Sequence, residues 1–216
     1  MAQLFTHRAT VRFRAAIALV LAGGLGLAAL LFFWARSDAA WNVGKPARQP
    51  IPFQHSLHAG TLGIDCRYCH STVERAAAAG MPTASTCLTC HSEIWQGASL
   101  LEPVRTSAAL DVPIPWVSLH RLPAHAYFHH GIHVQKGVAC ETCHGRVDQM
   151  AETVKTQTLS MGWCLDCHRD PADRIRPQGA VFSMGWGPHD KGAPEEVRAF
   201  YLEARSRLTD CSTCHR

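Results

Sequence analysis

The chain has 216 residues, a formal net charge of +4 and hydrophobic residues at 47% of its positions. No arginine-rich tract or nucleic-acid-binding motif is present, which argues against a nucleic-acid-binding protein. The unusual feature is the content of sulfur and imidazole, with ten cysteines and fourteen histidines.

Residues 15–35 form an uncharged apolar segment, AAIALVLAGGLGLAALLFFWA. A helix needs about 20 such residues to cross the hydrocarbon core of a bilayer. Arg8, Arg12 and Arg14 precede the segment, so the positive-inside rule predicts a cytoplasmic N-terminus and a chain that otherwise lies outside. Residues 1–36 are therefore predicted to be a cytoplasmic tip and a single-pass anchor in the cell membrane. The alternative is a secretory signal peptide cleaved near Ser37-Asp38-Ala39, but its apolar region would normally be shorter, about 7 to 15 residues.

Residues 37–52 contain Pro46, Pro50 and Pro52 and are predicted to be an extended linker. Residues 53–92 then carry the pattern Phe53-x-His55-x-x-His58, followed by two C-x-x-C-H motifs. This motif is the signature of covalent c-type haem attachment. Its two thiols add to the haem vinyl groups as thioethers, and the histidine binds the iron from the proximal side. Between the two motifs, the alanine run 76–79 favours a short helix that ends at Gly80.

Five such motifs account for every cysteine in the chain. They are Cys66-x-x-Cys69-His70, Cys87-x-x-Cys90-His91, Cys140-x-x-Cys143-His144, Cys164-x-x-Cys167-His168 and Cys211-x-x-Cys214-His215. Zinc ribbons, disulfide scaffolds and thioredoxin-like sites also use paired cysteines, but none of them needs a histidine after every second cysteine. The sequence therefore predicts five haem c groups on the extracytoplasmic side.

The two-haem pattern occurs twice. Residues 93–125 form a proline-rich connector without cysteine, and residues 126–169 repeat the first module with Phe128-x-His130-x-x-His133 ahead of two further motifs. Residues 170–216 form a tail that carries the fifth motif. Within the tail, residues 194–208 favour a helix, with proline and glutamate at the start and arginines near the end.

Nine histidines lie outside the motifs, and all of them except His7, which is expected on the cytoplasmic side, are candidates for the sixth ligands of the irons. In the H-x-x-H spacing, one imidazole can reach the haem that follows in sequence and the other a second iron. This assigns His55 and His58 to the first module, and His130 and His133 to the second. For the fifth iron we favour His120, with Met161 and Met184 as rivals and His125, His129 and His189 as weaker candidates. A methionine ligand would raise the potential of that haem.

These observations predict a mainly α protein with much irregular structure, in which a multihaem cytochrome c packs around five haems behind one N-terminal transmembrane helix. With every iron closed by two side chains, it would carry electrons and would not be catalytic alone. A multihaem reductase of nitrogen or sulfur compounds would need an open iron, and the surplus of ligands argues against one.

The chain resembles the membrane-anchored pentahaem cytochrome subunit of alternative complex III, a quinol oxidoreductase. The resemblance rests on the single N-terminal span and on the stretches FQHSLHAGTLGIDCRYCHS, LPAHAYFHHGIHVQKGVACETCHGRVDQM, LSMGWCLDCHR and CSTCHR. It implies three kinds of partner, namely an iron–sulfur subunit, polytopic membrane subunits and a mono-haem cytochrome c. It also implies electron transfer from quinol towards a c-type cytochrome or an oxidase. The alternative function is a membrane-anchored quinol dehydrogenase that serves a periplasmic reductase.

Overall fold

The computed structural model describes residues 5–186 and 194–215. The candidate ligand His189 lies outside these residues. The chain divides into two compact units, with the boundary between Val43 and Gly44. Each unit is described by itself below.

The first unit contains one long helix, α1, which spans His7–Arg36 and has no buried residue. It begins at Thr6, whose Oγ1 accepts a hydrogen bond of 3.3 Å from the backbone N–H of Ala9. Within the described residues, α1 is the one helix long and apolar enough to cross a membrane by length and composition. It contains the whole apolar segment 15–35 and extends it towards the N-terminus, which fits a single-pass membrane anchor.

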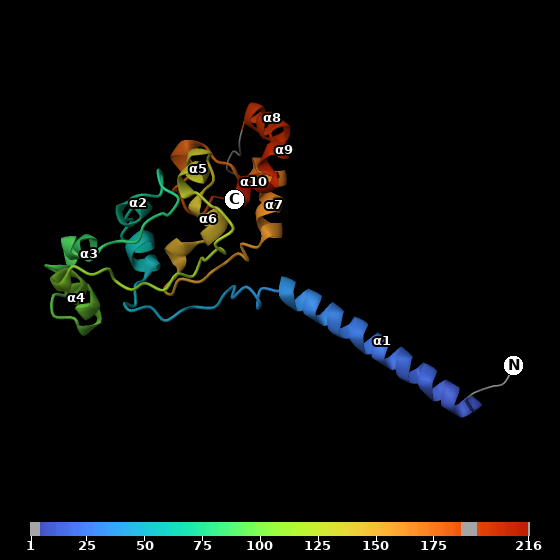
Figure 1. Cartoon of the computed structure of the whole chain (residues 1–216). Helices are drawn as coiled ribbons and strands as arrows, with labels where there is room; N and C mark the ends of the chain where they lie inside the picture. Colours follow the sequence, from blue (N-terminus) through green and yellow to red (C-terminus); the bar gives the residue numbers. More distant parts are fainter. Residues whose placement is uncertain (1–4, 187–193, 216) are drawn as a thin grey trace. The chain divides into compact units, whose positions relative to one another are not determined.

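The second unit begins at Gly44 and consists of short helices joined by irregular chain (Figure 1). Its α-helices are α2 (Cys66–Cys69), α3 (Ala84–His91), α4 (Glu102–Leu110), α5 (His130–Gln135), α6 (Cys140–His144), α7 (Met161–Arg169), α8 (Glu195–Glu203), α9 (Arg205–Leu208) and α10 (Cys211–Cys214). Single turns of other helix types are η1 (Ser56–Thr61, a π-helical turn) and the 3₁₀ turns η2 (Ser99–Leu101), η3 (Val147–Gln149), η4 (Ala172–Arg174) and η5 (Gln178–Ala180).

Extended chain in the second unit pairs only at isolated positions. Within residues 44–186 and 194–215, the two β-bridges join Pro46 to Val154 and Val138 to Ile175, and no longer strand is present. The predicted fold class, mainly α with much irregular structure and one long apolar N-terminal helix, is therefore confirmed. The alanine run 76–79 does not form the expected helix, because the carbonyls of Ala76 and Ala77 accept hydrogen bonds from the backbone of Gly131 and His130.

Helix caps fix where several of the short helices begin. Asp65 starts α2 by accepting a hydrogen bond of 2.8 Å from the N–H of Arg67. Asp210 starts α10 in the same way, with 2.9 Å to the N–H of Ser212, and Ser160 starts α7. A side-chain oxygen at this position satisfies an N–H group that the first helical turn leaves unpaired. The caps thus place three of the Cys-x-x-Cys segments on defined helical turns.

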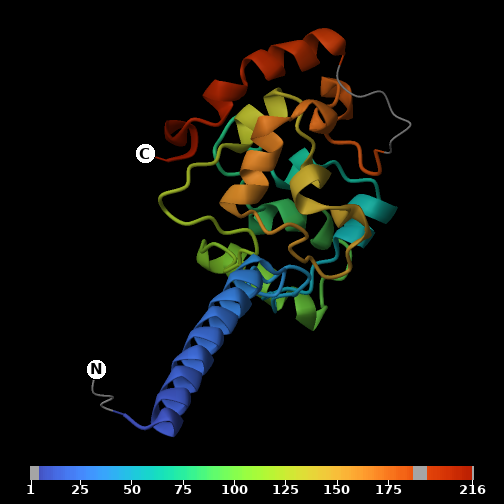
Figure 2. The same cartoon turned by 90° about the vertical axis from the view of Figure 1, so that its right-hand side faces the viewer.

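The helices of the second unit follow one another across the domain. Figure 1 shows α3 and α4 at one end, α7 to α10 at the other, and α5 and α6 between them. Figure 2 shows the red C-terminal helices following one another along one edge. The apolar core is small, and its largest fully buried side chains are only Val104 and Val181. Large flat cofactors would therefore contribute much of the interior.

A buried ion pair connects the tail to the third motif. The guanidinium of Arg176 binds the carboxylate of Glu141, and the two side chains are 8% and 11% exposed. The other carboxylate oxygen of Glu141 accepts a hydrogen bond of 2.6 Å from the N–H of Gly185. Removing one partner of such a pair leaves an uncompensated buried charge. We expect Glu141→Gln to lower the free energy of unfolding of the haem-loaded protein by about 3 kcal/mol, measured by guanidinium denaturation.

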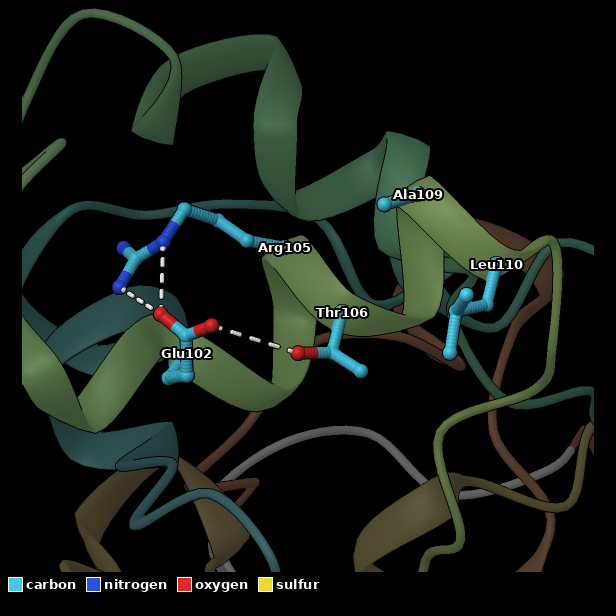
Figure 3. A pocket seen from close by; sticks show the side chains of 5 residues that line it. All are labelled: Glu102, Arg105, Thr106, Ala109 and Leu110. Atoms are coloured by element: carbon cyan, nitrogen blue, oxygen red, sulfur yellow. Dashed lines mark hydrogen bonds and ion pairs between the residues drawn. The ribbon is translucent and has the colours of Figure 1, made fainter.

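The matched control for this substitution is Glu102→Gln. Glu102 faces Arg105 on α4 at 2.5 Å, but its side chain is 64% exposed. Both residues line a surface pocket of about 350 Å³ with Thr106, Ala109 and Leu110 (Figure 3). Exposed pairs contribute little because water and salt screen them. A loss for Glu102→Gln as large as that for Glu141→Gln would contradict the assignment of the Arg176–Glu141 pair to the core.

Candidate haem centres

Each Cys-x-x-Cys segment lies on a helical turn, on α2, α3, α6, α7 and α10 in chain order. No disulfide bond joins any of the ten cysteines, all of which lie within the described residues. One helical turn brings the two sulfurs of a motif to the same side of the backbone, which is the arrangement that two thioether bonds to one porphyrin edge require. The pocket on α4 contains neither cysteine nor histidine, so it is not the candidate site.

The motifs follow one another in space in an order that differs from the sequence. The first adjoins the second, because the hydroxyl of Tyr68 bonds to Oγ1 of Thr89 at 2.8 Å. The first also adjoins the third, since the thiol of Cys66 and burial together raise the pKa of Cys140. Burial and the thiols of the fourth motif raise the pKa of Cys143 to about 12. The third motif therefore lies between the first and the fourth.

The fifth motif lies at the end of this row, beside the fourth. Nδ1 of His168 bonds to the carbonyl oxygen of Leu208 at 2.8 Å, three residues before the fifth motif begins. Burial and the neighbouring Cys214 raise the pKa of Cys164. The order in space is thus second, first, third, fourth and fifth motif.

Three predicted distal histidines lie opposite the proximal histidine of a motif. The ring centres are 6.3 Å apart for His58 and His91, 6.3 Å for His130 and His144, and 6.1 Å for His133 and His168. A metal–nitrogen bond to imidazole is about 2 Å long and the ring centre lies roughly 1 Å further back, so two axial imidazoles place their centres about 6 Å apart. The three spacings fit one iron between each pair of rings.

The fourth predicted distal histidine, His55, lies near His70 of the first motif. Burial and then the nearby imidazole of His70 lower the pKa of His55 to about 4. Burial, followed by the neighbouring rings of His120 and His130, lowers the pKa of His144 to about 3. Both rings are therefore neutral at pH 7, which is the form that donates an electron pair to a metal.

Hydrogen bonds at Nδ1 orient eight of the ten histidines that are predicted to be axial ligands. Seven rings bond to a backbone carbonyl, at 2.7–3.2 Å. The carbonyls are those of Gln54 for His58, Gly80 for His70, Ile94 for His91, Ala77 for His130, His129 for His133, Leu208 for His168 and His125 for His215. In the eighth, Nδ1 of His55 bonds to Oγ1 of Thr153 at 2.8 Å. A ring that donates from Nδ1 presents the lone pair of Nε2, so the seven rings bonded to carbonyls are prepared to bind a metal through Nε2, and His55 is so prepared in the tautomer that donates to Thr153.

A phenylalanine packs on both distal histidines of each module. The ring of Phe53 lies edge-on to His55 at 4.9 Å and 87°, and faces His58 at 4.3 Å and 26°. Phe128 repeats this packing, at 4.7 Å and 88° for the first histidine and 4.4 Å and 28° for the second. The repeat seen in the sequence is thus also a repeat of side-chain geometry.

The remaining ligand candidates lie in different places. His120 packs against His144, with ring centres 4.3 Å apart, and its Nε2 is buried without a hydrogen-bond partner in the described residues. The structure thus places His120 beside the third motif, although the sequence favours it for the fifth iron. The ring beside His215 is that of His125, at 5.7 Å.

His125 supports His215 through its backbone. Its carbonyl oxygen accepts the hydrogen bond from Nδ1 of His215 at 2.9 Å, so its backbone lies on the side of that ring away from Nε2. Nδ1 of His129 accepts from the N–H of Ile132 at 3.3 Å and caps α5. Met161 is 64% exposed at the first residue of α7, and Met184 is half-buried. Sequence reasoning missed the contacts of His125 and Thr153, for which no local pattern gives a signal.

No protein-family model matches the chain. The chain is similar to the "Menaquinone reductase, multiheme cytochrome c subunit" of Nitratidesulfovibrio vulgaris (strain Hildenborough), with 27% identity over 155 residues. The aligned part covers 69% of this chain and 64% of that protein, so the chain spans less than two thirds of its length.

Proposed function

We propose that this chain is a membrane-anchored cytochrome c with five haems, and that it is an electron-transfer subunit of a quinone-linked oxidoreductase complex. The observation that carries the proposal is the set of opposed imidazole rings at 6.1–6.3 Å, each pairing a motif histidine with a histidine of an H-x-x-H segment. The haem irons supply reversible one-electron chemistry when bound. The chain's own part is to attach the porphyrins and to orient both axial rings.

The residue roles follow from the motifs and the ring contacts. The ten cysteines form thioethers, and His70, His91, His144, His168 and His215 are the proximal ligands. His55, His58, His130 and His133 are the distal ligands of the first, second, third and fourth haem. This pairing is the same in both modules, because the first histidine of each H-x-x-H segment serves the motif that follows and the second serves the motif after it. Two imidazoles on each of these four irons would favour low-spin haems that carry electrons.

The finer assignment is to a complex of the alternative complex III type. The similarity to a subunit of a menaquinone reductase supports a quinone-linked membrane complex, and the family resemblance of the motifs supports this type. The partners would be an iron–sulfur subunit, polytopic membrane subunits and a mono-haem cytochrome c. With α1 as an uncleaved anchor and the N-terminus cytoplasmic, the haem domain would lie on the periplasmic side.

A second candidate is a quinol dehydrogenase that serves a periplasmic reductase. The relative's printed name concerns menaquinone, and α1 is apolar enough to place the chain at the membrane, so direct reaction with a quinol is the competing function. The purified chain alone would then reduce its haems with a soluble menaquinol analogue. The subunit proposed above would need its partners for this reaction.

Purification in mild detergent tests the proposal. The intact mass of the chain should equal the full sequence plus five haems, and proteomics of the preparation should find the membrane and iron–sulfur partners. Fewer than five covalently bound porphyrins, or ready binding of carbon monoxide by most of the irons, would refute the proposal. A mature N-terminus near Ala40 would refute the membrane anchor alone.

The position of His120 leads to a separate prediction. Because its ring packs on His144, we expect His120→Asn to change the electron paramagnetic resonance (EPR) signal of the third haem. The same substitution is then made in a chain that lacks the fifth haem, Cys211→Ser with Cys214→Ser. The change should persist there. If it disappears, His120 is the distal ligand of the fifth iron, as the sequence favours.

A further inference from the structure

The hydrogen bond at Nδ1 of His55 differs in kind from the other seven. Its partner is the side-chain hydroxyl of Thr153, at 2.8 Å, whereas the other seven rings bond to backbone carbonyls. A carbonyl partner cannot be removed by substitution, and a hydroxyl partner can. Thr153 is also 98 positions from His55 in sequence and belongs to the segment between the third and fourth motifs.

We propose that Thr153 is a positioning residue for the distal imidazole of the first haem and sets the potential of that haem. The proposal rests on the proposed function, in which His55 is that ligand. An imidazole bound to iron through Nε2 carries its proton on Nδ1, so Nδ1–H of His55 donates to Oγ1 of Thr153. Such an acceptor fixes the ring orientation and raises the basicity of the ligand. A more basic ligand stabilises the ferric state and lowers the haem potential.

The backbone on both sides of Thr153 holds its hydroxyl in place. The carbonyl oxygen of Met150 accepts a hydrogen bond of 3.0 Å from the N–H of Ser56, in the turn that begins next to His55. Val154 pairs with Pro46 in a β-bridge. The close approach also depends on Gly60, because a β-carbon there would lie 2.2 Å from the carbonyl oxygen of Asp148. Backbone contacts on both sides of Thr153 therefore position its hydroxyl.

The second module supplies an internal comparison. His130 occupies the position of His55 in the repeat, and its Nδ1 bonds to the carbonyl of Ala77 at 2.7 Å. In each module, the first distal histidine is thus held by the other module, once by a carbonyl and once by a hydroxyl. Only the first haem would then respond to a substitution at the hydroxyl position.

The test compares Thr153→Val with Thr153→Ser in the haem-loaded full chain. Valine keeps the size of the side chain and removes the hydroxyl, and serine restores the hydroxyl. Spectroelectrochemical titration should show one of the five midpoint potentials shifted upwards in Thr153→Val and returned towards the original value in Thr153→Ser. The EPR signal of the same haem should also shift in Thr153→Val, because the imidazole of His55 can rotate once its hydroxyl partner is lost. Thr106→Val removes an exposed hydroxyl on α4 that bonds to Glu102 (Figure 3), and it should leave all five midpoint potentials unchanged.

A chain without the first haem, Cys66→Ser with Cys69→Ser, completes the test. In this background Thr153→Val should shift no potential. Unchanged potentials in Thr153→Val, or a shift that persists in this background, would overturn the proposal while leaving the proposed function intact. If Thr153→Val retains too little protein to titrate, pulsed EPR of the wild-type chain and Thr153→Ser gives a second measurement. The coupling between the exchangeable Nδ1 proton of His55 and the iron of the first haem should be equal in the two proteins. Different couplings would overturn the proposal.

Discussion

Replacing His133 by alanine is expected to convert one haem in five from low-spin to high-spin. His133 lies opposite His168, with ring centres 6.1 Å apart, so its loss would open the sixth position of the fourth iron. An open ferrous iron binds carbon monoxide, which a bis-histidine iron does not do readily. Carbon monoxide difference spectra should therefore show about a further one fifth of the haem responding in His133→Ala compared with the wild-type chain. EPR should show a new high-spin signal of matching intensity.

The control for this substitution is His129→Ala. His129 lies four residues before His133 and caps α5 through its ring nitrogen, at 3.3 Å from the N–H of Ile132. Loss of a helix cap costs about 1 kcal/mol, but it should leave the spin state of every iron as it is in the wild-type chain. If His129→Ala binds carbon monoxide to the same extent as His133→Ala, His133 is not the ligand. If His133→Ala binds no additional carbon monoxide, the 6.1 Å between the ring centres of His133 and His168 does not reflect a shared iron.

Phe128→Leu is expected to disturb two haems at once. The phenyl ring touches both His130 and His133, at 4.7 and 4.4 Å between ring centres. Aromatic contacts of this kind contribute about 1 kcal/mol each beyond the area they bury, so the substitution should lower the free energy of unfolding by about 2 kcal/mol. It should also shift the EPR signals of the third and fourth haems, because both distal rings lose the surface that fixes their orientation.

The first module gives the complementary experiment. Phe53 makes the same contacts with His55 and His58, so Phe53→Leu should shift the signals of the first and second haems and leave those of the third and fourth unchanged. Phe200→Leu is the matched control, since Phe200 is 54% exposed on α8. If Phe53→Leu and Phe128→Leu shift the same EPR signals, the two phenyl rings act through general destabilisation of the protein. No shift in either variant would mean that the distal rings are held without them.

The parts of the site that could be predicted from the sequence are those with a local pattern. The Cys-x-x-Cys-His spacing needs only one helical turn, and each motif lies on one. The duplicated Phe-x-His-x-x-His spacing predicted that the four histidines are equivalent in pairs, and the ring contacts of Phe53 and Phe128 agree to within 0.2 Å. Apolar length alone predicted α1.

The contacts that could not be predicted join residues far apart in sequence. Nothing near Thr153 indicates a hydrogen bond to His55, 98 positions away. The alanine run 76–79 has a high intrinsic helix propensity, but two of its carbonyls bond to the backbone of Gly131 and His130. Here a tertiary partner outweighs the local preference. His120 shows the same limit, because its sequence neighbours do not reveal that the chain folds back onto the third motif.

The exchange of hydrogen bonds between the modules has a consequence for biogenesis. A chain is synthesised from its N-terminus, and its domains generally fold in that order. The ring of His55 reaches its partner only after Thr153 has been made, and the ring of His130 needs the carbonyl of Ala77 from the part made earlier. The haem-attachment machinery would therefore receive the first motif before His55 is held by Thr153, whereas His58, His70 and His91 already have local partners. A nascent chain that stalls ahead of residue 153 should carry a first haem whose distal coordination is still loose.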